Sequence, residues 1–216
     1  MKFIKKIFWL GSAFVCINAQ AIPVTFDVIS NQDSPVFQTV VYLEPDGEVE
    51  IAESKKQVAV MDQVDRQFMP HILAVQKGNK VVFPNSDSIK HHVYSFSPAK
   101  QFELKLYKGS DAEPLLFENQ GEVELGCNVH DWMLAYIWVV DTPYFAKTDQ
   151  NGKVTIDVPS GNYRVKVWHP RIQDDLEGLT QEVSINAPTN VSFRLKQKLL
   201  QDLSFYEQAA DKLTDY

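Results

Sequence analysis

Residues 123–140 read VELGCNVHDWMLAYIWVV, and this stretch decides both the fold and the chemistry expected of the chain. The residues before Cys127 alternate between apolar and other side chains, and the run after Met133 is apolar and rich in aromatic and β-branched residues. We therefore predict two strands joined by a short loop. Cys127, His130 and Met133 follow one another in that loop with two residues between each pair. The spacing brings a thiol, an imidazole and a thioether into one short segment.

A second source of imidazole lies upstream, where His91 and His92 begin another predicted strand. One thiolate, two imidazoles and one thioether form a soft donor set that suits copper, with the thioether as a weak axial ligand. His91 and His92 are both kept as candidates at this point, because strand alternation directs them to opposite faces and only one of them can join the loop donors. A Cys–His nucleophile pair would leave Met133 unexplained. A zinc site would lack a good fourth ligand, and a chance cluster without metal is the third alternative.

The rest of the chain also reads as strands. Short alternating runs recur at spacings of about 8–12 residues, separated by turns rich in Gly, Pro, Asn and Asp, which is typical of β-sandwiches. Residues 77–80 (KGNK) predict a hairpin turn. Only residues 196–216 show an approximately helical spacing of leucines. The formal net charge of −7 argues against a general nucleic-acid binder, which would need clustered Lys and Arg.

The N-terminus has the features of an export signal. A lysine-rich start is followed by an apolar stretch and by the small residues Ala19 and Ala21. The apolar part is shorter than the roughly 20 residues that a membrane-spanning helix needs. We expect cleavage after Ala21 and a periplasmic protein without a membrane span. Cys16 then leaves with the signal, so Cys127 becomes the single, odd cysteine in a disulfide-permissive compartment.

Three segments together resemble a known family. Residues 83–85 (FPN), residues 91–93 (HHV) and the spacing of the loop that begins at Cys127 are similar to the cupredoxins, the small blue type 1 copper proteins of the plastocyanin and amicyanin kind. The chain as a whole resembles exported cupredoxins that carry the label methylamine utilization proteins. The resemblance implies a Greek-key β-sandwich and one type 1 copper ion. It implies the ligands His91, Cys127, His130 and Met133.

The surroundings of the ligands depart from the family pattern at two positions. Asn85 stands at the interval before His91 that the family shows. The family usually has Asn after the upstream histidine and Ser or Thr after the cysteine, whereas this chain has His92 and Asn128. In the family that pair links the two ligand segments by a hydrogen bond. We expect His92 and Asn128 to replace the bond together.

A second, smaller sandwich is expected outside the copper-binding part. Residues 148–154 and 159–165 resemble the transthyretin-like sandwiches appended to carboxypeptidases. Such a sandwich needs about seven strands, and the C-terminal part supplies four or five. Residues 24–43 read as its opening hairpin, so the cupredoxin would be inserted into it; two domains in series is the alternative. The predicted organisation is a signal peptide at 1–21, a cupredoxin domain at 58–142, a second sandwich made of 22–57 and 143–197, and a helix or tail at 198–216.

The resemblance implies a periplasmic mononuclear copper protein that transfers single electrons between redox partners and is not itself an enzyme. The expected partner is a redox protein such as a cytochrome or a dehydrogenase, with no nucleic acid involved. The alternative is a periplasmic protein that binds or delivers copper. Delivery favours exposed, exchangeable sites rich in Met or His, and the donor set that contains Cys127 favours electron transfer.

Overall fold

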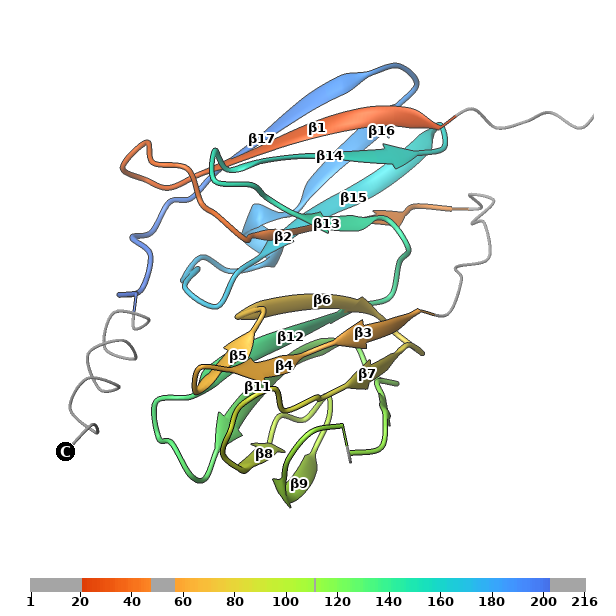
Figure 1. Ribbon diagram of the computed structural model, residues 1–216. Helices are drawn as coiled ribbons and strands as arrows, with labels where there is room; N and C mark the ends of the chain where they lie inside the picture. Colours follow the sequence, from red (N-terminus) through yellow and green to blue (C-terminus); the bar gives the residue numbers. More distant parts are fainter. Residues whose placement is uncertain (1–20, 48–56, 111, 203–216) are drawn as a thin grey trace, which may run out of the picture.

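The computed structural model describes residues 21–47, 57–110 and 112–202 (Figure 1). Over these ranges the chain is nearly all strand, with one helical element, the 3-10 turn Glu177–Leu179, so the predicted all-β class is confirmed. Within the same ranges no helix is long and apolar enough to cross a membrane. The predicted signal peptide lies outside the described residues except for Ala21. Residues 196–202 form no helix. The rest of the predicted C-terminal helix, residues 203–216, lies outside the described residues.

The upper sandwich in Figure 1 is built from strands at the two ends of the sequence. One sheet has the order β14-β1-β17 and the other has the order β13-β2-β15-β16. A core that includes Phe26, Leu43, Tyr163 and Phe193 fills the space between them. The strand bounds are β1 (Ile22–Ile29), β2 (Val40–Pro45), β13 (Phe145–Lys147), β14 (Lys153–Val158), β15 (Gly161–Trp168), β16 (Gln181–Ile185) and β17 (Thr189–Arg194).

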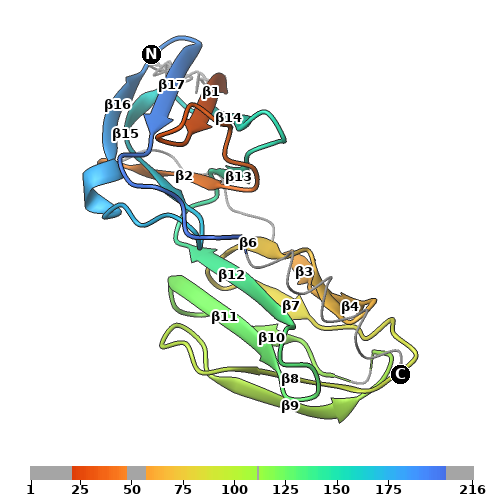
Figure 2. The same cartoon turned by 90° about the vertical axis from the view of Figure 1, so that its left-hand side faces the viewer.

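The lower sandwich contains all the strands between β2 and β13 in sequence, and Figure 2 shows its two layers face to face. Its main sheet has the order β6-β12-β11-β8-β9, and facing it are the sheet β10-β7-β3 and the two-stranded ribbon β4-β5. The bounds are β3 (Val58–Val60), β4 (Asp62–Val64), β5 (Gln67–Met69), β6 (Ile72–Gln76), β7 (Lys80–Val82), β8 (His91–Ser95), β9 (Phe102–Tyr107), β10 (Leu115–Leu116), β11 (Gly121–Cys127) and β12 (Leu134–Val140).

The first two strands pair with strands from the end of the chain. β1 pairs with β14 and β17, and β2 pairs with β13 and β15. We propose that the two sandwiches are separate domains, with the lower one inserted into the upper one. A domain must fold as a unit by its own core, so the predicted boundaries stay a prediction until unfolding is measured.

Two hairpin predictions are wrong for the same reason. β1 and β2 lie in opposite sheets of the upper sandwich, and β6 and β7 lie in opposite sheets of the lower one. The turn at residues 77–80 has the left-handed Gly78 (φ 84°) that a tight turn requires, but Gly78 donates its N–H to Phe117 O at 2.7 Å instead of closing a two-stranded ladder. A sharp turn therefore moves the chain across the sandwich.

The two sandwiches meet through an aromatic cluster. Tyr42 from β2, Trp138 from β12 and Trp168 from β15 are buried in it, and the Trp138 and Trp168 rings stack with centroids 4.5 Å apart and planes at 10°. β2 carries four consecutive buried residues because its two faces are covered by different sandwiches. The same double burial explains the apolar end of β12.

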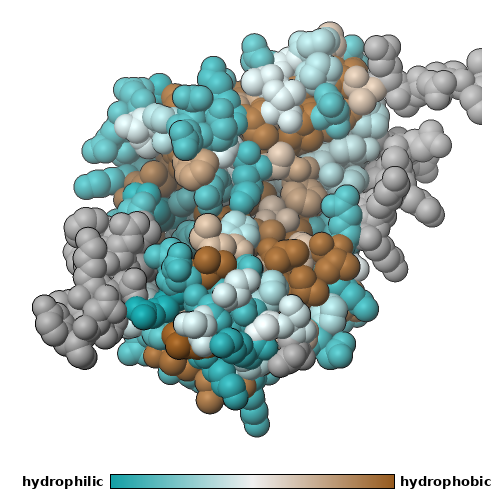
Figure 3. All heavy atoms as spheres, viewed as in Figure 1, coloured by the Kyte–Doolittle hydropathy of each residue, from teal (hydrophilic) through white to brown (hydrophobic). Residues whose placement is uncertain are grey.

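The surface between and below the sandwiches is mixed in hydropathy. Figure 3 shows brown atoms over the edge strand β3, where Val58 is 58% exposed and Val60 is 47% exposed. Scattered exposed aliphatic side chains are ordinary on protein surfaces. The two sandwiches contact each other through the buried aromatic cluster of Tyr42, Trp138 and Trp168.

The first prediction concerns this contact. Trp168→Ala removes one half of the stacked pair, and we expect it to lower the free energy of unfolding by about 3 kcal/mol, the range for a buried Trp truncation. Because the stack joins two proposed domains, urea unfolding should also separate into two transitions. Phe96→Ala, which truncates a side chain that is 79% exposed, is the matched control and should change little. A Trp168→Ala variant that unfolds in one transition at an unchanged midpoint would contradict the proposed domains.

A buried histidine lies at the seam between the sandwiches. His169 follows β15 and lines a cavity of about 320 Å³ together with His71, Arg171 and Asp202. Its Nδ1 accepts the Arg171 backbone N–H at 3.1 Å. Burial, followed by the positive charges of Arg171 and His71, lowers the pKa of His169 to about 4.

The second prediction concerns the pH dependence of stability. The unfolded chain takes up a proton at His169 below about pH 6.5, whereas the folded chain takes it up only near its pKa of about 4. Between about pH 6.5 and pH 4 the unfolded state therefore binds more protons than the folded state. The free energy of unfolding falls as the pH falls through this window, by about 3 kcal/mol over the whole of it. His169→Gln should lose less stability than the parent protein between pH 7 and pH 4.5 in urea titrations. Equal losses would show that other groups control the acid sensitivity.

Candidate metal centre

The strand register places the start of β8, the end of β11 and the start of β12 at the same end of the main sheet. β11 ends at Cys127, which lies opposite Val93 of β8, so the start of β8 and the end of β11 coincide. β12 begins one residue after Met133 and runs antiparallel to β11. Side chains alternate along β8, and His91 points inward while His92 points outward. The loop between β11 and β12 therefore lies beside the His91 ring.

Three donor side chains meet at this end and all are buried. One ligand atom each of His91, Cys127 and His130 lies within 4.8 Å of the other two, and this is the only such group that includes a His or Cys in the part of the chain that the structure describes. His91 Nδ1 lies 3.7 Å from Cys127 Sγ. The His91 and His130 ring centroids are 5.0 Å apart. His91 rather than His92 is therefore the upstream histidine that the fold places here.

Met133 closes the loop that carries two of these donors. Its backbone N–H donates to His130 O at 3.0 Å, and its side chain is 2% exposed. Met133 belongs to the same buried cluster as Cys127 and lines the same surface groove. Trp132, whose ring lies 5.1 Å from that of His130, packs against that cluster.

Asp87 was missed in the sequence and is the closest polar partner of the site. Its Oδ2 lies 2.6 Å from His91 Nε2, the ring nitrogen that faces away from Cys127. The carboxylate also accepts the backbone N–H groups of Asp65 and Arg66 at 2.7 and 2.9 Å. A carboxylate that holds the second nitrogen of a ligating histidine fixes its tautomer and ring orientation. The signal available in the sequence was an acidic residue four positions before His91.

The charges of these groups are mutually dependent. Burial alone lowers the pKa of His91, but the hydrogen bonds to Cys127 and Asp87 outweigh it and raise the pKa. Burial raises the pKa of the Cys127 thiol, yet the hydrogen bond from His91 and nearby backbone N–H groups bring it below its ordinary value. The backbone N–H of Arg66 and the contact with His91 likewise outweigh burial and lower the pKa of Asp87. The arrangement favours a thiolate at Cys127, the form that binds metal.

Asn85 holds the loop that leads into His91. Its side-chain N–H₂ donates to Ile89 O and Tyr107 O, both at 2.9 Å, and its Oδ1 accepts the Asp87 backbone N–H at 3.0 Å. Asn85 is 3% exposed, so these bonds also satisfy its buried polar atoms. The side chain positions Asp87 and, through it, the His91 ring.

His92 and Asn128 lie side by side on the outer face. Asn128 Nδ2 and His92 Nδ1 are 3.3 Å apart, and the Asn128 backbone N–H donates to His92 O at 3.2 Å. His92 Nε2 lies 2.9 Å from a carboxylate oxygen of Glu103 on β9. These contacts connect the β8 segment with the ligand loop.

The donor set fits a soft transition metal. Bonds of about 2.3 Å to sulfur and about 2.0 Å to nitrogen, spread at tetrahedral to trigonal angles, separate the two donor atoms by about 3.5–3.7 Å. The measured 3.7 Å between Cys127 Sγ and His91 Nδ1 agrees with this separation. A thiolate with two imidazoles is the set that copper electron-transfer sites use, with a weak axial thioether. The separation of these two donor atoms therefore fits a shared metal ion.

No protein-family model matches the chain, and no curated protein matches its sequence. Solved structures that it is similar to include cupredoxins and a copper-containing nitrite reductase. A purple cupredoxin from Nitrosopumilus maritimus is 21% identical, with 38% of this chain and 99% of that chain covered and a TM-score of 0.35. Amicyanin from Paracoccus versutus is 14% identical, with 46% and 98% covered and a TM-score of 0.35.

A copper-containing nitrite reductase from Thermus scotoductus SA-01 is also similar, at 19% identity and a TM-score of 0.37. The match covers 45% of this chain but only a quarter of the length of that enzyme. All these TM-scores are below 0.5.

The third prediction concerns Asp87. Asp87→Asn removes the charge that fixes His91 Nε2, and loss of such a partner typically lowers metal affinity about 10- to 100-fold. Competition with a chelator would measure the affinity for Cu(I). Asp62→Asn is the matched control, because Asp62 bonds Ser86 Oγ at 2.8 Å in the same region without contacting a donor residue. Equal affinities of Asp87→Asn and Asp62→Asn would show that Asp87 does not position the ligand.

Proposed function

We propose that this chain is a periplasmic mononuclear type 1 copper protein that transfers single electrons between redox partners. The observation that supports it most is the buried cluster of His91, Cys127 and His130, whose donor atoms lie within 4.8 Å of one another. Met133, which is buried in the same cluster as Cys127, would be the fourth residue that holds the copper ion in this proposal. Copper bound there would supply a one-electron couple, since thiolate and thioether suit Cu(I) and imidazole suits both oxidation states.

The residues of the chain contribute rigidity and exclusion of water. The His91 ring is fully buried and held by Asp87, and Cys127 is 3% exposed. A held ligand set changes little between oxidation states, which favours fast electron exchange. His92, Asn128 and Asn85 brace the two ligand segments in this proposal. Delivery of copper would instead favour an exposed, exchangeable site, so burial of the donors supports electron transfer over the alternative of a copper-delivery protein.

The remaining parts of the proposal concern the surroundings of the site. A signal peptide cleaved after Ala21 would export the protein to the periplasm, where a cytochrome or a dehydrogenase would be the redox partner. The protein is not an enzyme in this proposal. A single ligand set of this kind in the described residues provides one electron at a time.

The fourth prediction tests the site by spectroscopy and voltammetry. The copper-loaded protein should show an intense visible band from thiolate-to-Cu(II) charge transfer and a reversible one-electron wave. Cys127→Ser should lose both while keeping the fold, because thiolate covalency produces them. His91→Gln should also lose them, whereas His92→Gln should retain them because His92 points outward. Copper binding without the visible band in the parent protein would favour the delivery function instead.

A further inference from the structure

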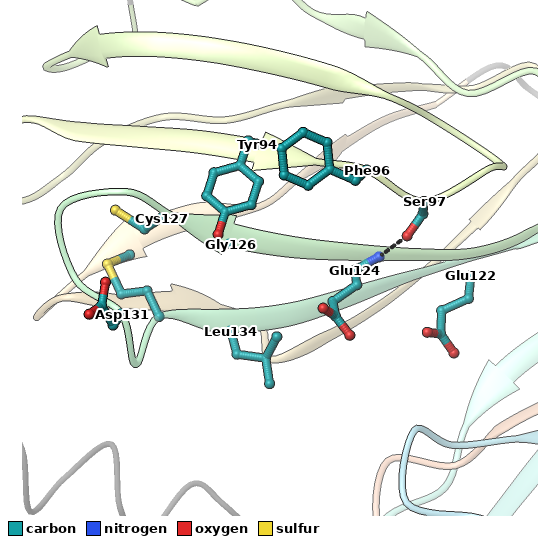
Figure 4. Close-up of a pocket in the computed structure, with 10 residues that line it drawn as sticks. Tyr94, Phe96, Ser97, Glu122, Glu124, Gly126, Cys127, Asp131 and Leu134 are labelled. Atoms are coloured by element: carbon teal, nitrogen blue, oxygen red, sulfur yellow. Dashed lines mark hydrogen bonds between the residues drawn. The ribbon is translucent and has the colours of Figure 1, made fainter.

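The cavity at the seam between the sandwiches shares no residue with the proposed copper site. The groove beside Cys127, drawn in Figure 4, borders that site. The other cavity, of about 320 Å³ and called the seam cavity below, is lined by residues from the loop 35–38, the start of β6, the segment after β15 and the chain at 199–202. A cavity of a few hundred Å³ that combines apolar walls with a few polar groups is typical of sites for small molecules.

One part of the seam cavity is apolar. Phe37, Ile72 and Leu199 line it. Phe37 is 48% exposed, and an aromatic side chain at the rim can cover the apolar part of a ligand. The next residue, Gln38, has a φ of 58°, which is uncommon for a residue other than glycine, and such backbone positions gather at binding sites. This part of the cavity suits the body of a small organic molecule.

His169 offers a hydrogen-bond donor to the seam cavity. The residue is 9% exposed, and burial lowers its pKa to about 4, so the ring is neutral at pH 7. Because Nδ1 accepts the Arg171 backbone N–H at 3.1 Å, the proton of the neutral ring lies on Nε2. Within residues 21–47, 57–110 and 112–202, Nε2 has no hydrogen-bond partner. A buried N–H group of this kind calls for an acceptor, not for a metal ion.

The guanidinium of Arg171 is held in place at the same cavity. Its Nε donates to Leu200 O at 2.7 Å, and the Leu200 N–H donates back to Arg171 O at 2.8 Å. Its Nη1 donates to Asp202 Oδ2 at 3.0 Å. A guanidinium fixed by backbone contacts is prepared to bind a carboxylate, because its planar fork of N–H groups matches the two carboxylate oxygens.

Asp202 already presents a carboxylate to this guanidinium. The side chains of Arg171 and Asp202 are 33% and 56% exposed, and ion pairs of such exposure contribute little to stability. The carboxylate of another molecule can therefore take the place of the Asp202 side chain. The chain itself thus shows which chemical group fits beside Arg171.

The charges around the seam cavity favour an added anion. Asp202 is the single carboxylate among the described residues that line it. Lys147 adds a second cation to Arg171, because its Nζ donates to Ile72 O and its charge acts on the His71 ring. The two cations outweigh the one carboxylate, so a negatively charged ligand is attracted.

From these contacts we propose that the seam cavity binds a small organic carboxylate. The carboxylate group displaces that of Asp202 from Arg171 and accepts the Nε2–H of His169. The apolar body lies against Phe37 and Ile72. Ile72 begins β6 of the lower sandwich, whereas Phe37 lies in the loop between β1 and β2 of the upper one, so the ligand contacts both sandwiches. This binding goes beyond the proposed electron transfer and requires no metal.

The fifth prediction uses 4-fluorobenzoate as the probe and the full, metal-free chain at pH 7. The amide NMR signals of Phe37, Ile72 and Arg171 should shift as the probe is added, and the fluorine signal of the probe should broaden. 4-Fluorobenzamide has nearly the same shape without the charge. It should bind about tenfold more weakly, because it cannot form the charge-assisted hydrogen bonds of the carboxylate.

Two substitutions should change the affinity for 4-fluorobenzoate in opposite directions. Arg171→Gln should weaken binding about tenfold through loss of a charged donor. Asp202→Asn should strengthen it about threefold, because the competing carboxylate is removed.

Each substitution has a matched control that should bind the probe as the parent protein does. Arg164→Gln removes a guanidinium that pairs with Glu44 outside the cavity. Asp141→Asn removes a carboxylate that is 55% exposed and lies 3.0 Å from Lys77, closely matching the exposure and pairing of Asp202.

Three results would overturn the inference. Signal shifts centred outside the seam cavity would place the probe elsewhere. Equal affinities for the benzoate and the benzamide would show filling of an apolar space without recognition of the carboxylate. Equal affinities of Asp202→Asn and Asp141→Asn would show that Asp202 does not compete for Arg171. The gain expected for Asp202→Asn keeps the test decisive even if Arg171→Gln fails to fold.

Discussion

The pairing of β8 with β11 is the constraint on which the site depends. Cys127 lies opposite Val93 and Gly126 opposite Tyr94 in that ladder. A shift by one residue would turn His91 outward and His92 inward, since side chains alternate along a strand. The same ladder brings Tyr94 onto Gly126, so the inner cluster and the outer groove share one register. The loop that carries Cys127 and His130, the upstream His91 and the surface above them are therefore positioned by one register.

Four residues at this end of the sandwich, Asn85, Asp87, His91 and Cys127, form a chain of contacts. Asn85 holds Asp87, Asp87 holds His91, and His91 contacts Cys127. An unpaired polar group in the interior would cost several kcal/mol, whereas each of these has a partner. The contacts also fix the direction of each ring and carboxylate before any metal binds. The same hydrogen bonds therefore orient the side chains and satisfy buried polar groups, so substitution of Asp87 is expected to affect both.

The upper sandwich changes what the cupredoxin-like sheet shows to solvent. Stacking of Trp168 on Trp138 covers one part of the outer face, and the continuous apolar sequence of β2 reflects contact with both sandwiches. The uncovered part lies beside Cys127 and carries the carboxylates of Glu122 and Glu124. The second sandwich thereby covers part of the outer face without contributing a residue to the cluster of His91, Cys127 and His130.

Sequence alone determined the features that depend on neighbours along the chain. The all-β class follows from alternation and turn residues, and the grouping of Cys127, His130 and Met133 follows from spacing within one loop. Alternation along β8 also predicted opposite directions for His91 and His92. Only the tertiary structure decided that β1 and β2, like β6 and β7, lie in opposite sheets, and that Asp87 holds His91 and Tyr94 covers Gly126. Covalent geometry fixes the direction of each side chain along a strand, whereas the partner of a strand is chosen by packing between residues far apart in the chain.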